Sequence, residues 1–290
     1  MARLVTYVAS QDGASVGSYL RSSLSPAARR EVVGGLLSRE DGNLVLEFDR
    51  RGLTWTVPAG NIITTSLYVS GEYEGAKISG LLSWLTTHGY DVGPDRVAVD
   101  LGANVGTTTL PLAQVMHVLA VEPVPTTFDF LTHNIAQNGY DDRVVALRTA
   151  IGEKSGCVHM VTPSHGSSHI VAQATDDSIS VPAAPLMELL DQGGVAAADV
   201  AFVWSDTEGT ENAVVRTGEP LWDRGVPLFA EVWPHSDLGD VVGPHFTEFV
   251  PGRELAAKGP EAEAQPIARF PEYRSSVGDV LLIPRVRPMG

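Results

Sequence analysis

The sequence predicts an open α/β fold built on a doubly wound, mostly parallel sheet of seven strands. From residue 97 onward, short apolar runs alternate with amphipathic stretches of helical period. The 290 residues are 43% hydrophobic and 19% charged, a balance typical of a globular protein with a sizeable core. Alternation of this kind indicates parallel strands joined by right-handed helical crossovers.

The strands and helices of this sheet are expected at regular intervals along the chain. Strands are predicted at 97–101, 118–121, 144–147, 201–204, 228–232 and 279–283, and helices at 107–117 and 126–137. Residues 157–161 and 178–181 are expected to be strand-like pieces of an insertion. Residues 251–266, rich in Ala, Glu, Gly and Pro, are expected to form an exposed excursion.

Residues 1–90 have a different pattern and are expected to form an extension that packs as a substrate-side lid on a core of residues 91–290. Ser25 and Pro26 are typical of the first positions of a helix, which is predicted to run to residue 37. Residues 44–48 and 53–57 flank a turn and predict a β-hairpin. A further helix is expected over 74–88, with Gly89 at its C-terminal end.

The charge and cysteine content limit the classes of partner. The net charge of −15 comes from 35 acidic and 20 basic side chains, so phosphate backbones and anionic lipids should be repelled. The single cysteine, Cys157, allows neither an intrachain disulfide nor a cysteine-rich zinc site. No apolar run approaches the ~20 residues of a membrane span. A cytoplasmic enzyme with a small-molecule partner is expected, without nucleic acid or membrane, and the sequence leaves open whether it is a homo-oligomer.

The strongest local signal is a glycine-rich turn between the strand at 97–101 and the next helix. Gly102 allows a ligand to approach the backbone, and Gly106 allows the helix to pack closely on the strand. Asn104 and Thr107 occupy two of the glycine positions of a dinucleotide-binding turn. Asp100 places a carboxylate where a pyrophosphate would be repelled. A cationic cofactor without phosphate, S-adenosylmethionine, therefore fits better than a nicotinamide dinucleotide.

An acid also ends the second predicted strand of the core. Glu122 lies 22 positions after Asp100, and a carboxylate at this place commonly accepts the hydroxyls of a ribose. A solvated carboxylate at a strand end is the alternative.

Several motifs together resemble the FkbM family of methyltransferases. They are Asp100 to Gly106, Val121-Glu122-Pro123, Asn134 to Gly139, Ser205 to Glu211, and the upstream Gly71-Glu72-Tyr73-Glu74. The resemblance covers about residues 45–240 and 279–284. It implies a class I methyltransferase (Rossmann-like) fold, S-adenosylmethionine as the cofactor and, usually, O-methylation of natural products or sugars. Thr207 and Thr210 depart from the bulkier residues common in the family, so the substrate side should be individual to this protein.

The resemblance also implies roles for particular residues. Glu122 would hold the ribose, and Thr149 and Ala150 would lie near the adenine. Asp100, Gly102, Asn104 and Gly106 would surround the methionine part and the sulfonium.

Three residues are candidates for the transfer step. Asp206, at the end of the fourth predicted strand, is the first candidate for a base or a group that orients the acceptor, with His165 and His169 second. Asp206 could instead cap the following helix, and the two histidines could be plain loop residues. No metal is expected. The alternative left open is a Mg²⁺ site formed by Asp206, Glu208, Glu211 and Asn212.

The function expected from these signals is S-adenosylmethionine-dependent O-methylation of a hydroxyl on a sugar or secondary metabolite. Carboxylate or amine methylation remains open, because nothing in the sequence fixes the acceptor atom. The rival classes are a nicotinamide-dependent oxidoreductase, which the spacing of the turn opposes, and a nucleoside-binding module without catalysis.

Overall fold

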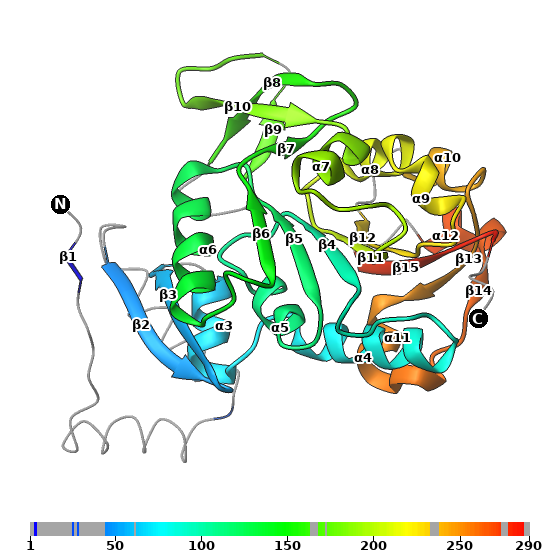
Figure 1. The fold of residues 1–290 in the computed structure, drawn as a ribbon, viewed down its shortest axis with the longest axis horizontal. Helices are drawn as coiled ribbons and strands as arrows, with labels where there is room; N and C mark the ends of the chain where they lie inside the picture. The colour runs from blue at the N-terminus through cyan, green and yellow to red at the C-terminus, as the bar shows by residue number, and fades with distance from the viewer. Residues whose placement is uncertain are drawn as a thin grey trace.

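A mixed sheet of eight strands forms the centre of the protein (Figure 1). The computed structural model describes residues 3–4, 25, 28, 44–60, 62–162, 168–171, 173–232, 238–273 and 278–286. The strands are β4 (Val97–Leu101), β5 (His117–Val121), β6 (Val144–Leu147), β11 (Val200–Ser205), β12 (Leu228–Val232), β13 (Phe246–Pro251), β14 (Gln265–Pro266) and β15 (Gly278–Pro284). Their order is β14-β13-β15-β12-β11-β4-β5-β6.

Strands β6, β5, β4, β11 and β12 pair in parallel, and β15 pairs antiparallel with both β12 and β13. The expected doubly wound, mostly parallel α/β sheet is therefore present. The sheet has eight strands where seven were predicted, and neither β13 nor the two-residue edge strand β14 was among the runs named from the sequence. Strand order reverses between β4 and β11, which is where ligands bind in such sheets.

Helices cover both faces of the sheet because its central strands are apolar on both sides. On one face, Ala98 and Phe202 pack with α4 (Gly75–Thr87), α5 (Thr109–Ala113), α6 (Pro125–Gln137) and α11 (Gly252–Lys258). On the other, Val99 and Val203 pack with α7 (Leu186–Gln192), α8 (Glu211–Thr217), α9 (Glu219–Trp222), α10 (Leu238–Val242) and α12 (Phe270–Tyr273). Figure 1 shows α7 to α10 and α4 with α11 on opposite sides of the sheet.

A β-hairpin precedes this core, as the sequence predicts. Strands β2 (Leu44–Arg50) and β3 (Leu53–Pro58) pair antiparallel, followed by α3 (Ile62–Ser70), and the two-residue β1 (Arg3–Leu4) pairs in parallel with β2. The fully buried Asn134 of α6 accepts from Thr56 N at 2.8 Å and donates to Thr56 O at 3.1 Å. Its amide also donates to Val105 O at 2.8 Å. One side chain therefore joins the hairpin to the glycine-rich turn.

A smaller four-stranded sheet, ordered β7-β10-β8-β9, lies beside the main one. It consists of β7 (Ala150–Ile151), β8 (Gly156–Val161), β9 (His169–Val171) and β10 (Ser178–Ala184). Two of these strands are the strand-like pieces predicted for the insertion, each with slightly different bounds.

Two predicted elements differ from the structure. The helix expected over 107–117 is only α5 (Thr109–Ala113), because His117 already begins β5. The excursion expected over 251–266 is instead a packed element, since it contains α11, whose Leu255 is fully buried. A Cβ on Gly80 of α4 would lie 2.1 Å from Leu255 O, so the glycine lets the two helices touch.

Of the helix predicted from Ser25 to residue 37, the structure describes only Ser25 and Ala28. Ser25 Oγ accepts from Ala28 N at 3.2 Å, as an N-cap residue does. The helix predicted over 74–88 is α4, with Gly89 at φ 82° after its last turn. None of the helices within the described ranges combines the length and apolar character that crossing a membrane requires.

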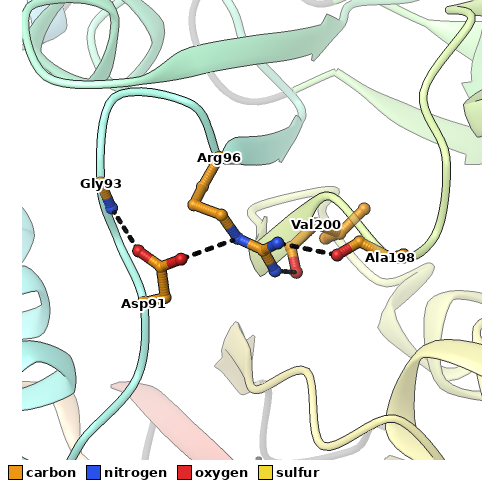
Figure 2. Close-up of polar contacts among 5 residues, drawn as sticks. All are labelled: Asp91, Gly93, Arg96, Ala198 and Val200. Atoms are coloured by element: carbon orange, nitrogen blue, oxygen red, sulfur yellow. Dashed lines mark hydrogen bonds and ion pairs between the residues drawn. The ribbon is translucent and has the colours of Figure 1, made fainter. Parts of the chain in front are cut away.

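The amino ends of β4 and β11 are joined by one guanidinium group (Figure 2). Arg96 donates to Ala198 O at 2.8 Å and to Val200 O at 3.1 Å. Asp91 Oδ2 lies 3.7 Å from Arg96 Nε, and Asp91 Oδ1 accepts from Gly93 N at 3.0 Å. Arg96 and Asp91 therefore both have partners at this edge.

Candidate active site

A cavity of about 590 Å³ opens at the carboxyl ends of β4, β5 and β11. This is the edge at which a doubly wound sheet binds its ligands, and the volume is in the usual range for small-molecule sites. The turn after β4, the loop after β11, the segment before α4 and the smaller sheet all contribute to its walls.

The glycine-rich turn forms the floor of this cavity. Gly102 N and Ala103 N donate to Val121 O at 2.9 and 3.0 Å, which ties the turn to the end of β5. Gly102 has φ 84°, and a Cβ there would lie 1.9 Å from Asp206 O. Only glycine therefore allows the ends of β4 and β11 to lie this close.

Glu122 faces the cavity from the end of β5. Its Oε2 accepts from Asn104 N at 2.9 Å and its Oε1 from Val124 N at 2.8 Å, and the residue is 6% exposed. Burial raises the pKa of this carboxyl to about 7, against the lowering effect of the two backbone donors. A carboxylate has about four acceptor sites, so capacity remains for two ribose hydroxyls.

Asp100 lies underneath the turn and is not among the residues that line the cavity. It is 1% exposed, and its Oδ2 accepts from Thr109 Oγ1 at 2.6 Å at the start of α5. Its Oδ1 is buried without a hydrogen-bond partner. Burial raises its pKa to about 7. Asp100 therefore supports the turn from below, and its expected place around the methionine part and the sulfonium stays a prediction.

The described lining residues include no lysine, arginine or histidine. Four of them are acidic: Glu74, Glu122, Asp206 and Glu208. A phosphate would find no cationic partner on these walls, whereas a positively charged ligand would be attracted. The lining thus fits the sulfonium of S-adenosylmethionine and opposes a dinucleotide.

Asp206 lies at the mouth of this cavity among other carboxylates. Its backbone N donates to Leu101 O at 2.9 Å, which fixes it at the end of β11. Carboxylate oxygens of Asp206, Glu208 and Glu231 lie within 4.8 Å of one another. Burial, then Glu231 and Glu208, raise the pKa of Asp206 well above its usual value. Its carboxyl therefore holds a proton at a higher pH than an ordinary aspartate does.

The neighbouring Glu211 has a structural task. This residue is 1% exposed and accepts from Thr207 N at 3.1 Å, Thr207 Oγ1 at 3.0 Å and Gly209 N at 3.1 Å. It thereby holds the loop after β11 in place. The acidic group considered from the sequence as a Mg²⁺ site is thus rearranged, because Glu211 turns to the loop and Glu231 of β12 joins Asp206 and Glu208.

Unusual backbone conformations gather at the cavity. Within the described ranges, four non-glycine residues have a left-handed backbone, and Glu74 (φ 62°), Asn104 (φ 52°) and Glu208 (φ 52°) all line this cavity. Such conformations cost of order 1–3 kcal/mol each and tend to occur at functional sites. The strain is therefore concentrated where the chemistry is expected.

The structure brings together most of the cofactor-binding residues expected from the sequence. Gly102, Asn104, Glu122, Thr149 and Ala150 line the cavity, whereas Asp100 and Gly106 do not. Gly106 instead allows tight packing, since a Cβ there would lie 3.3 Å from both Leu110 and Leu131.

The candidates for the transfer step are distributed differently. Asp206 lines the cavity, and so do Ser168 and Ile170 of the smaller sheet. His169, between them, is exposed and is not among the lining residues. His165 lies outside the described residues. Among the sequence candidates, Asp206 is thus the one that the structure places at the cavity.

Sequence reasoning did not assign Tyr73, Glu74 or Glu231 to the site. Tyr73 and Glu74 line the cavity from the segment before α4, and burial, then Glu74 and Asp206, raise the pKa of Tyr73 to about 12. The resemblance of residues 71–74 to a family motif could have indicated Tyr73 and Glu74 from the sequence. Glu231 carried no local signal, because only the pairing of strands brings it next to Asp206.

Comparison with known proteins gives the class of this domain. Residues 100–241 match the family model of the methyltransferase FkbM domain. The hexuronic acid methyltransferase AglP of Haloferax volcanii is 30% identical over 122 residues, which are 42% of this chain. The chain spans about half the length of this curated relative, since the match covers 49% of it.

Two solved structures are similar with low scores. The methyltransferase FkbM of Methylobacillus flagellatus KT has a TM-score of 0.43 at 12% identity, covering 76% of this chain and 53% of that one. A transferase of Pyrococcus horikoshii has a TM-score of 0.41 at 14% identity, covering 95% of this chain and 86% of that one.

The sheet, the turn and the acidic strand ends thus define an α/β domain that binds a nucleoside-type cofactor. More particularly, residues 100–241 match the methyltransferase FkbM domain, and the cofactor of this class of domain is S-adenosylmethionine. The cationic sulfonium, the absence of phosphate and the ribose hydroxyls agree with the described lining residues and with Glu122.

Proposed function

We propose that this protein transfers a methyl group to a hydroxyl of a small molecule, a sugar or a secondary metabolite. The observation that carries the proposal is Asp206, held at the mouth of the cavity with a raised pKa. A carboxylate whose pKa lies closer to neutrality is a stronger base, and hydroxyl acceptors are the ones that need a base.

The residues of the site would divide the work between them. S-adenosylmethionine supplies a methyl carbon on a positively charged sulfur. Glu122 and the backbone of the glycine-rich turn would hold the nucleoside, and Thr149 and Ala150 would lie along the adenine. Asp206 would orient the acceptor hydroxyl and take its proton. Alignment can supply ~7–11 kcal/mol, and proton transfer to a base contributes about 10²–10⁴-fold.

The charge of the cavity also bears on the acceptor. Glu74, Asp206 and Glu208 would repel an anionic group brought to the mouth. The similarity to a hexuronic acid methyltransferase supports a sugar acceptor. The acidic walls favour a sugar whose hydroxyls are flanked by neutral or cationic groups over one that carries a carboxylate.

The segment before residue 90 would form the substrate side of the site. Pro58, Ile62 and Ile63 line the cavity, and Ile62 is 72% exposed. An exposed isoleucine at a cavity edge gives an acceptor an apolar surface to contact. This division of work agrees with an extension over residues 1–90 and a cofactor-binding core over 91–290.

Calorimetry followed by a turnover assay tests the proposal. We expect S-adenosylmethionine to bind and NAD not to bind, with the affinity lost in Glu122→Ala and kept in the control Glu219→Ala, whose carboxylate lies on α9. Release of S-adenosylhomocysteine is then measured with neutral sugars, hexuronic acids and amino sugars. Binding of NAD, or binding of S-adenosylmethionine without release from any acceptor, would contradict the proposal.

A further inference from the structure

Lys77 of α4 is a cation placed among the carboxylates near Asp206. Its Nζ lies 2.5 Å from Glu74 Oε2 and also forms an ion pair with Asp279 of β15. The exposed fractions of the three side chains are 27%, 18% and 17%. These ion pairs are therefore largely shielded from water, and their effect on nearby charges is larger than that of a surface pair.

The two partners of Lys77 also act on Asp206. Asp279 pairs directly with Glu231 across the antiparallel strands β15 and β12. Glu231, Glu208, Asp279 and Glu74 are the four carboxylates that, after burial, raise the pKa of Asp206. Like charges directly opposite each other in a sheet are destabilising. The ammonium of Lys77, which is paired with Asp279, offsets the repulsion between Asp279 and Glu231.

Glu74 has a second reason to be held by a cation. It has a left-handed backbone with φ 62°, and both Lys77 N and Ile78 N donate to its backbone O, at 2.9 and 3.0 Å. The ion pair between Lys77 and Glu74 fixes the side chain of a residue that lines the cavity. Burial disfavours the ammonium, yet Asp279 and Glu74 together raise the pKa of Lys77, so it stays charged.

We propose that Lys77 is a positioning residue of the acceptor site, which clamps Glu74 to Asp279 and neutralises two of the four carboxylates around Asp206. The proposal rests on the proposed function, in which Asp206 is the base. Lys77 does not line the cavity, so it acts through Glu74 and Asp279 and does not touch the acceptor.

All the charged and titratable groups facing this cluster can be named by element. Glu208 belongs to the loop after β11, Glu231 to β12 and Asp279 to β15. Tyr73 and Glu74 precede α4, and Tyr273 of α12 donates from its hydroxyl to Asp279 O at 3.0 Å. Arg253 of α11 lies over the ring of Tyr273, with its guanidinium carbon 6.0 Å from the ring centroid. Lys77 is the cation that forms ion pairs with Glu74 and Asp279. Its removal should therefore make the surroundings of Asp206 more negative and favour the protonated carboxyl.

The test follows the protonation of Asp206 itself in the full-length protein. Protein labelled with ¹³C at the aspartate carboxyl is titrated by NMR in the presence of a chelator, and Asp206→Asn identifies the resonance. We expect the titration midpoint to rise by about one pH unit in Lys77→Met. Lys77→Arg keeps the charge and should return the midpoint to that of the wild type. The matched control is Lys258→Met, which removes an ion pair with Glu254 within α11 and should have no effect.

A second variant has the opposite sign and keeps the test decisive if Lys77→Met fails to fold. Asp279→Asn removes a negative neighbour, so the midpoint of Asp206 should fall. An unchanged midpoint in folded Lys77→Met, or a rise in Asp279→Asn, would overturn the proposal.

The pH profile of kcat/KM separates this inference from the proposed function. With an acceptor found in the turnover screen, the acidic limb should move with the NMR midpoint. If the midpoint moves and the limb does not, Lys77 tunes Asp206 but Asp206 is not the base. A third outcome is that the wild type shows the acidic limb, but no variant shifts either this limb or the NMR midpoint of Asp206. The role proposed for Lys77 is then wrong, whereas the role of Asp206 as the base stands.

Discussion

At the amino ends of β4 and β11, Arg96 donates to two carbonyls and lies beside Asp91 (Figure 2). At the carboxyl ends of the same strands, carboxylates of Asp206, Glu208 and Glu231 face one another. The pocket at the first edge is about 180 Å³ and is lined by Arg96 and Arg224, whereas the cavity at the second is about 590 Å³.

The two edges differ in whether their charged groups stabilise or destabilise the folded chain. At the amino edge Arg96 is paired with Asp91 and with two carbonyl groups, so this cluster contributes to folding without a further partner. At the carboxyl edge Asp206, Glu208 and Glu231 repel one another, and the left-handed non-glycine residues Glu74, Asn104 and Glu208 line the cavity there. Such features persist only where the rest of the fold compensates for them, and they are typical of functional sites.

Replacing Asp206 at the carboxyl edge should lower the rate of methyl transfer, whereas a matched replacement at the amino edge should not. We expect Asp206→Asn to lower kcat by about 10²–10⁴-fold, because the acceptor loses its base, while S-adenosylmethionine still binds by calorimetry. The matched variant at the amino edge is Asp91→Asn, which should leave kcat unchanged. Equal kcat values for the wild type and Asp206→Asn would show that Asp206 is not the base of the transfer step.

Gly102→Ala should be the most damaging change of backbone. A Cβ at this position would collide with Asp206 O at 1.9 Å, and the backbone has φ 84°. We expect unfolding in urea to show a loss above about 4 kcal/mol, together with loss of cofactor binding. Gly139→Ala is the control, with φ 71° and no atom within 4 Å of the added Cβ, and should lose only about 1–2 kcal/mol. Similar losses for the two variants would show that the close contact between β4 and β11 has little energetic weight.

Asp100 should make the folded protein less stable as the pH rises. Burial raises its folded-state pKa from 3.8 to about 7, so the folded state binds more protons than the unfolded state between these values. Stability should therefore fall from about pH 4 to about pH 7, by up to about 4 kcal/mol for this group.

Asp100→Asn should flatten this dependence, measured as the urea midpoint across the pH range without cofactor. Glu122, with a pKa of about 7, contributes in the same direction, so part of the slope should remain. Asp91→Asn should leave the slope intact. A slope that is equally steep in Asp100→Asn would show that Asp100 is ionised throughout.

Arg96→Met should have the smallest effect of the four substitutions Asp206→Asn, Gly102→Ala, Asp100→Asn and Arg96→Met. It removes two hydrogen bonds from a charged donor at the amino edge, which should cost about 1–3 kcal/mol of stability. S-adenosylmethionine should bind to Arg96→Met as it does to the wild type. Weaker cofactor binding in Arg96→Met would mean that the two edges are coupled.

The parts of the fold that the sequence predicted are those with a local signal. The runs at 144–147 and 228–232 are strands β6 and β12 with the predicted bounds, since each is a short apolar stretch between polar ones. Gly102 and Glu122 were recognisable because the turn and the strand end lie within a few residues of each other. Leu255 was missed because an Ala-rich, Glu-rich sequence is equally compatible with a loop until a partner such as Gly80 is known.

The acceptor side of the site was less predictable for a different physical reason. Glu231 and Asp279 are neighbours only because β15 pairs antiparallel with β12, and this pairing leaves no trace in either segment. His165 and His169 suggested acid–base chemistry by residue type alone. His169 begins strand β9, and its position depends on how the smaller sheet packs, which local sequence does not determine.

The hydrogen bonds of Asn134 have a consequence for how this protein can be divided into fragments. The family match begins at residue 100, yet β3 supplies two of the groups that satisfy this buried amide, and the third is Val105 O in the cofactor turn. A recombinant fragment beginning at residue 91 would remove both hydrogen bonds to Thr56 and leave one amide donor of Asn134 without its partner, although Gln137 Nε2 would still donate to Asn134 Oδ1 at 2.6 Å. Fragments for crystallography, and chimaeras that exchange acceptor specificity between relatives, should therefore keep the hairpin and the helix α6 from the same parent.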